Sequence, residues 1–97
     1  MPRNQQYQLQ IEKLKELMAY LRHFDTEIQN AVNSYRARLS ALIEQGLPVE
    51  VGERFISDFF QQSKNLSDRN TAVINDQAIP FVMHNIQGLE QLLGLGR

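Results

Sequence analysis

The sequence predicts an all-α protein built as an antiparallel two-helix hairpin, and three observations lead to this fold class. Apolar residues recur at heptad spacing along the first half of the chain, as they do on the buried face of a packed helix. Near the midpoint, Gly46 and Pro48 mark a place where one helix can end and another can begin. Apolar stripes at helical spacing then resume in a second half of similar length, so the two arms can fold back on each other.

The composition is that of one small domain, which we assign to residues 1–97. Of these residues 42% are hydrophobic and 22% are charged, and the net charge of −1 comes from interspersed residues of both signs. This composition is typical of a globular chain. A surface that follows nucleic-acid phosphates would show clustered Lys and Arg, so we expect no nucleic-acid partner. The absence of cysteine removes disulfides, thiol nucleophiles and thiolate metal sites.

The apolar runs bear on location. The longest one, Ala78 to Met83, is far shorter than a membrane span. No apolar segment follows a basic start at the N-terminus, so no cleavable signal peptide is visible. We therefore expect no membrane insertion and a cytoplasmic location, or export that does not depend on a cleaved signal.

The first helix is predicted over residues 5–45, a stretch without Gly or Pro. Two interleaved series of positions, each repeating every seven residues, define its apolar face: Tyr7, Leu14, Leu21, Ile28, Tyr35 and Leu42, with Ile11, Met18, Asp25, Val32 and Leu39. This is the seam of a helix that packs against another helix. Leu17 and Phe24 widen the seam on one side, and Asp25 is its one charged member.

The turn is predicted over residues 46–52. If Gly46 adopts a left-handed conformation after the last helical residue, Leu42 and Leu47 become the pair that meets in a Schellman cap. Pro48 cannot extend the first helix but suits the start of a second one. Glu50 would then lie near the positive end of the new helix, and Gly52 completes the turn.

The second helix is predicted over residues 53–93, with a kink near Pro80. Phe55, Ile56, Phe59 and Phe60 open it with a dense aromatic face at helical spacing, and the stripe continues through Leu66 and Val73. Pro80 removes one backbone hydrogen bond inside the pattern. No good N-cap residue stands immediately before it, so a kink is favoured over a break.

Folding the arms together pairs positions whose numbers sum to about 95, by the geometry of an antiparallel helix pair. Tyr35 then faces Phe59 or Phe60, and Leu14 faces Phe81. Asp25 falls opposite Asn70, with Arg69 and Thr71 beside it. Two interpretations of this layer are open: a buried polar layer that selects the register or the partner, or a carboxylate that points to solvent.

The apolar stripes are wider than two helices can cover, so we expect the hairpin to dimerise into a four-helix bundle. Eight residues are candidate interface residues: Leu17, Phe24, Phe55, Ile56, Phe59, Phe60, Phe81 and Met83. A third helix, broken off at Pro80 and folded over the hairpin, is the competing way to cover them. The aromatic cluster after the turn is either hairpin or dimer core, or a docking patch for a larger helical partner.

No residue pattern indicates catalysis or a cofactor. His23 and His84 are the two histidines, and neither belongs to a Glu-x-x-His pair or a His-Glu-x-x-His motif. The Glu residues of the first arm stand beside Lys and Arg, as on a solvated helix face. We therefore expect a protein that is not an enzyme and binds no metal or other cofactor. A metal- or small-molecule-binding bundle would rest on the two histidines alone.

The chain resembles the small WXG-type (ESAT-like) proteins of type VII secretion and their relatives that escort larger toxins. The likeness covers its length of about a hundred residues, two long helices, a central turn with glycine, and the absence of cysteine. It implies a hairpin that pairs into a four-helix bundle and takes part in targeting or export. The Trp-x-Gly motif itself is absent, because the chain has no tryptophan, and only Gly52 can be matched to it. The export pattern of a Tyr followed four residues later by an acidic residue is also absent after Tyr35.

These observations predict a non-enzymatic helical interaction protein that forms a homodimer, or a heterodimer with a helical protein, in the manner of a small escort. The alternative is a self-assembling structural or scaffold component, of the kind found in phages, whose hairpins stack beyond a dimer.

Overall fold

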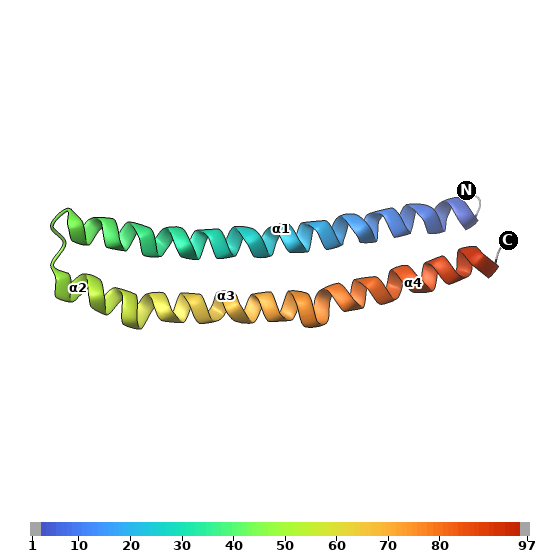
Figure 1. The fold of residues 1–97 in the computed structure, drawn as a ribbon. Helices are drawn as coiled ribbons and strands as arrows, with labels where there is room; N and C mark the ends of the chain where they lie inside the picture. Colours follow the sequence, from blue (N-terminus) through green and yellow to red (C-terminus); the bar gives the residue numbers. More distant parts are fainter. Residues whose placement is uncertain (1–2, 96–97) are drawn as a thin grey trace. The chain divides into compact units, whose positions relative to one another are not determined.

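Helices account for almost all of the computed structural model, which describes residues 3–95 (Figure 1). Helix α1 covers Arg3–Glu44 and is followed by the turn. The second arm runs from Val49 to Leu95 without a loop: α2 (Val49–Arg54), the π-helical segment η1 (Phe55–Phe60), α3 (Gln61–Val73), the π-helical segment η2 (Ile74–Ala78) and α4 (Ile79–Leu95). Within residues 3–95 there is no strand, so the all-α prediction is confirmed.

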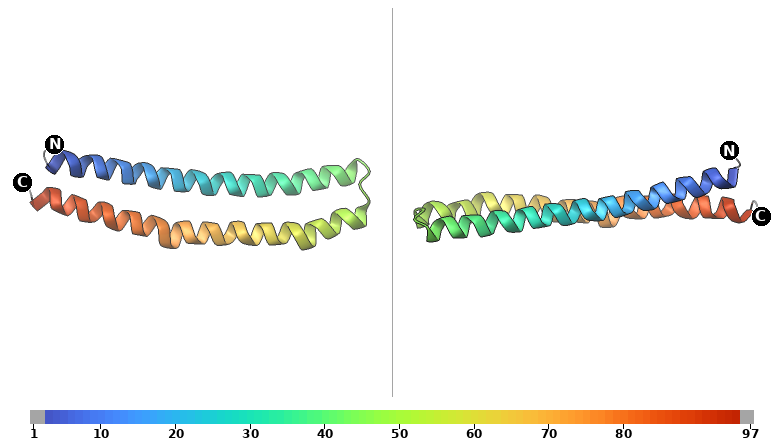
Figure 2. Two further views of the ribbon diagram at one scale, coloured as in Figure 1. Left: turned by 180° about the vertical axis from the view of Figure 1, so that it is seen from behind. Right: turned by 90° about the horizontal axis from the view of Figure 1, so that it is seen from above.

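The chain divides into two compact units, and α1 runs through both. The terminal unit contains Met1–His23 and Ala72–Arg97, and the turn unit contains Phe24–Thr71. Within each unit a part of α1 lies antiparallel to a part of the second arm, as the two views of Figure 2 show. The turn unit is thus a helical hairpin.

The terminal unit holds most of the buried apolar side chains. Ile11 of α1 packs with Val82 and Ile86 of α4. Five partly buried residues surround this cluster: Leu14, Met18, Leu21, Leu89 and Leu93. Ile74 and Ile79 are also buried. The α1 members are the heptad positions of the sequence pattern, so that pattern correctly identifies the inner face of this helix.

The turn is a Schellman cap. Gly46 has φ +119°, a conformation that glycine adopts without steric cost. The Leu47 N–H donates to the Leu42 carbonyl over 2.8 Å, and the Gly46 N–H donates to the Ile43 carbonyl over 3.2 Å, which are the two bonds that define the motif. The Pro48 carbonyl accepts the Gly52 N–H over 3.0 Å, so Pro48 starts the second arm.

Gly52 lies inside a helix, since the second arm starts four residues earlier than the predicted residue 53. Helix α2 begins at Val49, directly after Pro48, which is its N-cap residue. Gly52 is buried, and a Cβ atom on it would overlap the Ile43 side chain, with Cδ1 of Ile43 at 2.5 Å. It is therefore a point of close helix approach and not a turn residue.

The two π-helical segments change which residues of the second arm face α1. A π turn closes on the residue five positions back, and the Ile79 N–H accordingly donates to the Ile74 carbonyl. Ile74 and Ile79, five residues apart, are both buried. In a regular α-helix residues at this spacing point in different directions. The prediction that Leu66 and Val73 continue the buried stripe is wrong, because both are exposed and their successors Ser67 and Ile74 are buried.

The second arm passes through Pro80 as a helix. Segment η2 ends at Ala78, directly before α4, and Pro80 is the second residue of α4. The wider turn of a π segment can accommodate a backbone carbonyl that has lost its usual donor. The arm therefore continues past Pro80 instead of breaking there, and no separate third helix forms within residues 49–95.

Candidate interaction surfaces

Exposed apolar side chains are the main surface feature of both units. Among the residues whose side chains are described, fifteen large hydrophobic residues are exposed, whereas only six hydrophobic residues are buried. Isolated exposed hydrophobics are normal on a protein surface, but clusters of them mark interaction sites. Two such clusters can be defined here, one in each unit.

The cluster of the turn unit, which we call the aromatic patch, consists of Phe55 and Phe59 on η1. Their ring centroids are 4.9 Å apart with the planes at 53°, a tilted geometry favourable for aromatic pairs. Both rings are about half exposed, at 41% and 50%. Beside them the Arg54 Nε lies 3.3 Å from an Asp58 Oδ2. Exposed aromatic anchors next to a polar rim are typical of a protein–protein contact.

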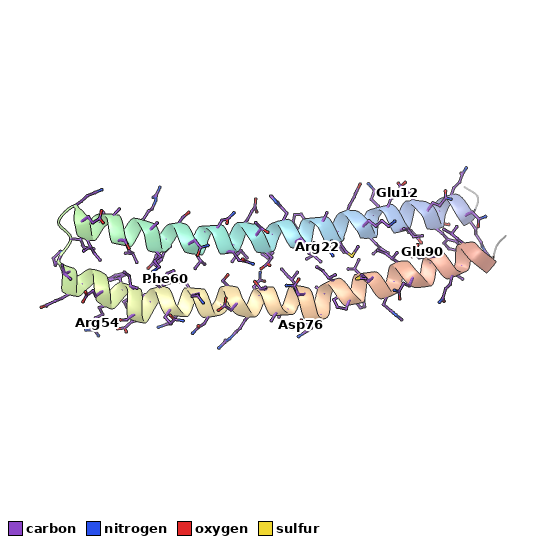
Figure 3. All side chains as sticks on the ribbon, in the orientation of Figure 1. Glu12, Arg22, Arg54, Phe60, Asp76 and Glu90 are labelled. Carbon is purple, nitrogen blue, oxygen red and sulfur yellow. The ribbon has the colours of Figure 1, made fainter. Side chains whose placement is uncertain are left out.

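Phe60 and Ile56, also predicted at the interface, lie inside the turn unit instead. The Phe60 ring is 4% exposed and stacks on Tyr35 with centroids 5.9 Å apart. The Arg36 guanidinium carbon is 5.7 Å from its centroid, close enough for a cation–π interaction. Figure 3 shows Phe60 between α1 and the second arm and Arg54 extending outward. The predicted Tyr35–Phe60 contact is confirmed, and Ile56 is half-buried.

The polar layer of the turn unit is centred on Asp25, which is 8% exposed. Its Oδ1 accepts the Thr71 hydroxyl at 2.6 Å and its Oδ2 accepts the Gln29 amide at 2.9 Å. The Gln29 amide is also 3.3 Å from the Thr71 hydroxyl. The interpretation in which Asp25 points to solvent is therefore wrong, since both carboxylate oxygens are occupied by donors, as burial requires.

The expected partners Asn70 and Arg69 are not part of this network. Arg69 is exposed. Asn70 is half-buried, and its Nδ2 is buried without a hydrogen-bond partner. Asp25 instead pairs with Thr71, one residue after Asn70. Their residue numbers sum to 96, close to the sum of about 95 that was expected for paired positions. The sequence argument located the layer correctly and placed Thr71 in it, but it put Asn70 directly opposite Asp25.

The cluster of the terminal unit, which we call the Phe81 flank, consists of Phe81 and an open groove of about 620 Å³ that is lined in part by Asn85. Seven residues line this groove: Leu9, Gln10, Lys13, Leu14 and Leu17 on α1, with Asn85 and Leu89 on α4. Phe81 lies one helical turn before Asn85, and the Asn85 amide donates to the Phe81 carbonyl over 2.8 Å. Phe81 and Asn85 thus lie on the same side of α4. The prediction that Leu14 meets Phe81 is wrong, because the Phe81 side chain is 70% exposed.

The remaining predicted interface residues are also on the surface. Leu17, Phe24 and Met83 are exposed. Met83 is two residues from Phe81, which places the two side chains on different sides of α4. Sequence reasoning missed Leu9 and Leu92, which are exposed in the terminal unit. Leu92 follows Asn85 by seven residues, so the heptad spacing was the signal that could have found it.

Metal-ligand clusters and membrane-spanning helices are absent from the described residues. No group of three His, Asp or Glu side chains comes close enough to hold a metal ion within residues 3–95. In the same range, none of the helices combines the length and the hydropathy that crossing a bilayer requires. His84 is exposed.

Comparison with known proteins gives no relative: no protein-family model, no curated protein and no solved structure matches this chain.

Proposed function

We propose that this chain is a non-enzymatic interaction protein whose exposed apolar surfaces are covered by helices of a partner, which completes a four-helix bundle. The observation that supports this proposal is the excess of exposed over buried hydrophobic side chains.

The aromatic patch is the proposed anchor for a larger helical protein. Phe55 and Phe59 present two adjoining rings from one helix side, and paired aromatic side chains supply much of the binding free energy of helix-in-groove complexes. In this role the chain resembles the small partner and escort proteins of type VII secretion. The likeness in length, helix number and turn position supports that assignment.

The test is the mass of the protein in extracts of the cells that encode it. We expect a species that contains this chain and a helical partner, and we expect Phe59→Asp to remove the partner from it, because a carboxylate cannot be buried without a partner. Val49→Asp is the matched control: it removes another exposed apolar side chain of the turn unit, but at a helix N-terminus, where a carboxylate is favoured. It should leave the mass unchanged.

Two results would change this conclusion. A native species with the mass of one chain would remove the proposal. Open-ended species of many chains would favour the self-assembling scaffold over the escort.

A further inference from the structure

We infer that the Phe81 flank of the terminal unit is a self-pairing surface, in which Phe81 of each of two copies enters the groove of the other. This inference deepens the proposed function and rests on it, since it names a second copy of this chain as the occupant of one of the two surfaces. Three features of the terminal unit carry it.

The first feature is that one surface holds both a protruding side chain and a groove that can receive it. Phe81 is the most exposed large hydrophobic residue among those described, at 70%. The groove begins at Asn85, one helical turn away on the same side of α4. A two-fold interface requires that residue i meets residue j while residue j meets residue i. A knob and a hole side by side on one helix meet this condition when two α4 helices cross antiparallel near the level of residue 83.

The second feature is the charge distribution of α4. From Gln77 to Leu89 the sequence contains no Asp, Glu, Lys or Arg. Two copies can therefore face each other along this segment without bringing like charges together, which would otherwise oppose self-association. The second arm of the turn unit differs, because it carries the ion pairs Arg54–Asp58 and Lys64–Asp68. Depletion of charge at the centre of the contact is also the compositional mark of protein interfaces.

The third feature is the apolar character of the groove. Leu9 and Leu17 on α1 are exposed at 44% and 42%, and Leu14 and Leu89 form its partly buried floor. Polar groups at the rim are few, namely Gln10, Lys13 and Asn85. A phenyl ring buries about 150–250 Å² when it is fully enclosed, and the groove offers it mainly aliphatic neighbours. A second copy thus covers Phe81 and the leucines in one step.

Sedimentation velocity of the purified full chain, from about 1 µM to about 100 µM, tests this inference. We expect a dimer. Phe81→Glu should raise the dissociation constant of this dimer at least about a hundredfold, because the carboxylate would enter an apolar groove. Met83→Glu is the matched control, since Met83 is exposed two residues away on another side of α4. It should leave the dimer intact.

Leu17→Glu, on the other wall of the groove, should act like Phe81→Glu. Circular dichroism should show that all variants keep their helix content.

Cross-linking tests the arrangement of the two copies, because the chain has no cysteine of its own. An equimolar mixture of Phe81→Cys and Asn85→Cys chains should form disulfide-linked dimers on oxidation, whereas Met83→Cys chains alone should not. A wild-type chain that stays monomeric throughout the concentration range, or a dimer that both Phe81→Glu and Leu17→Glu leave intact, would overturn the inference. If the purified chain is a monomer but its native assembly depends on Phe59, the proposed function stands and only the self-pairing surface is lost.

Discussion

Gly46 and Gly88 occupy opposite backbone situations, and they should respond in opposite ways to alanine. Gly46 has φ +119°, where a Cβ is strained, so Gly46→Ala should lower the free energy of unfolding by about 1–2 kcal/mol. Gly88 lies inside α4 without a positive φ, and a Cβ there would meet nothing within 4 Å. Gly88→Ala should therefore raise the free energy of unfolding by about 0.5–1 kcal/mol.

Urea unfolding followed by circular dichroism measures both changes, and each glycine is the control for the other. Equal effects of the two substitutions would show that the Schellman cap does not depend on the left-handed conformation of Gly46.

Asp25 shows how a single residue can set the register of a hairpin. Its two oxygens are held by Thr71 from the second arm and by Gln29 from its own helix. A shift of the second arm along α1 would separate the carboxylate from the Thr71 hydroxyl and leave a buried charge with one donor fewer, which costs about 1.5–3 kcal/mol. The layer thus disfavours other registers even though it adds no apolar burial.

At the scale of the elements, Gly52 determines how closely α2 approaches α1. Gly52→Ala would gain about 1 kcal/mol of helix propensity but would force its Cβ into the Ile43 side chain, and overpacking of this kind costs about 1–3 kcal/mol. We expect a net loss in the wild-type background. In the Ile43→Ala background the overlapping atoms are gone, so the same substitution should become neutral or stabilising.

A double-mutant cycle of Gly52→Ala and Ile43→Ala measures this reversal of sign through urea unfolding. If Gly52→Ala has the same effect in both backgrounds, the close approach of the two helices is not what keeps position 52 a glycine.

The helices themselves were predictable from the sequence, whereas the phase of the second arm was not. Heptad spacing identified the inner face of α1, and Gly46 with Pro48 identified the turn, because each signal acts locally. The π segments depend on packing between distant residues: Ile74 and Ile79 can both be buried only if the turn between them is widened. Propensity rules assume one uniform helix. They therefore placed Leu66 and Val73 on the buried face, one residue before the side chains that are buried in the structure.

The same widening explains why Pro80 does not end the arm. In an unrelieved helix interior a proline costs about 3 kcal/mol, and the sequence alone gives no sign of relief. Segment η2 directly precedes α4. The backbone hydrogen bonds therefore already depart from the α-helical pattern in the turn before Pro80, which is the turn where proline lacks its N–H donor. Packing of the isoleucines and tolerance of Pro80 are thus served by one local distortion.

At the scale of the whole molecule, the sequence predicted that apolar side chains would remain exposed, but it did not identify all of these residues correctly. Leu17, Phe24, Phe55, Phe59, Phe81 and Met83 are exposed as the width of the stripes suggested. Phe60 was misassigned because an aromatic residue at helical spacing fits a core and an interface equally well. Packing against Tyr35 separates Phe60 from its exposed neighbour Phe59, and the sequence does not show that contact.

A protein with so few buried apolar residues should draw part of its stability from association. Self-pairing stabilises the folded state by mass action, so the urea midpoint of the wild-type chain should rise between about 1 µM and about 100 µM. Each tenfold increase in concentration is equivalent to about 1.4 kcal/mol once the dimer is populated. The Phe81→Glu chain should show a lower midpoint that is the same at all concentrations, because its unfolding no longer includes dissociation. A wild-type midpoint that does not move with concentration would mean that the hydrophobic residues buried within one chain stabilise it without a second copy.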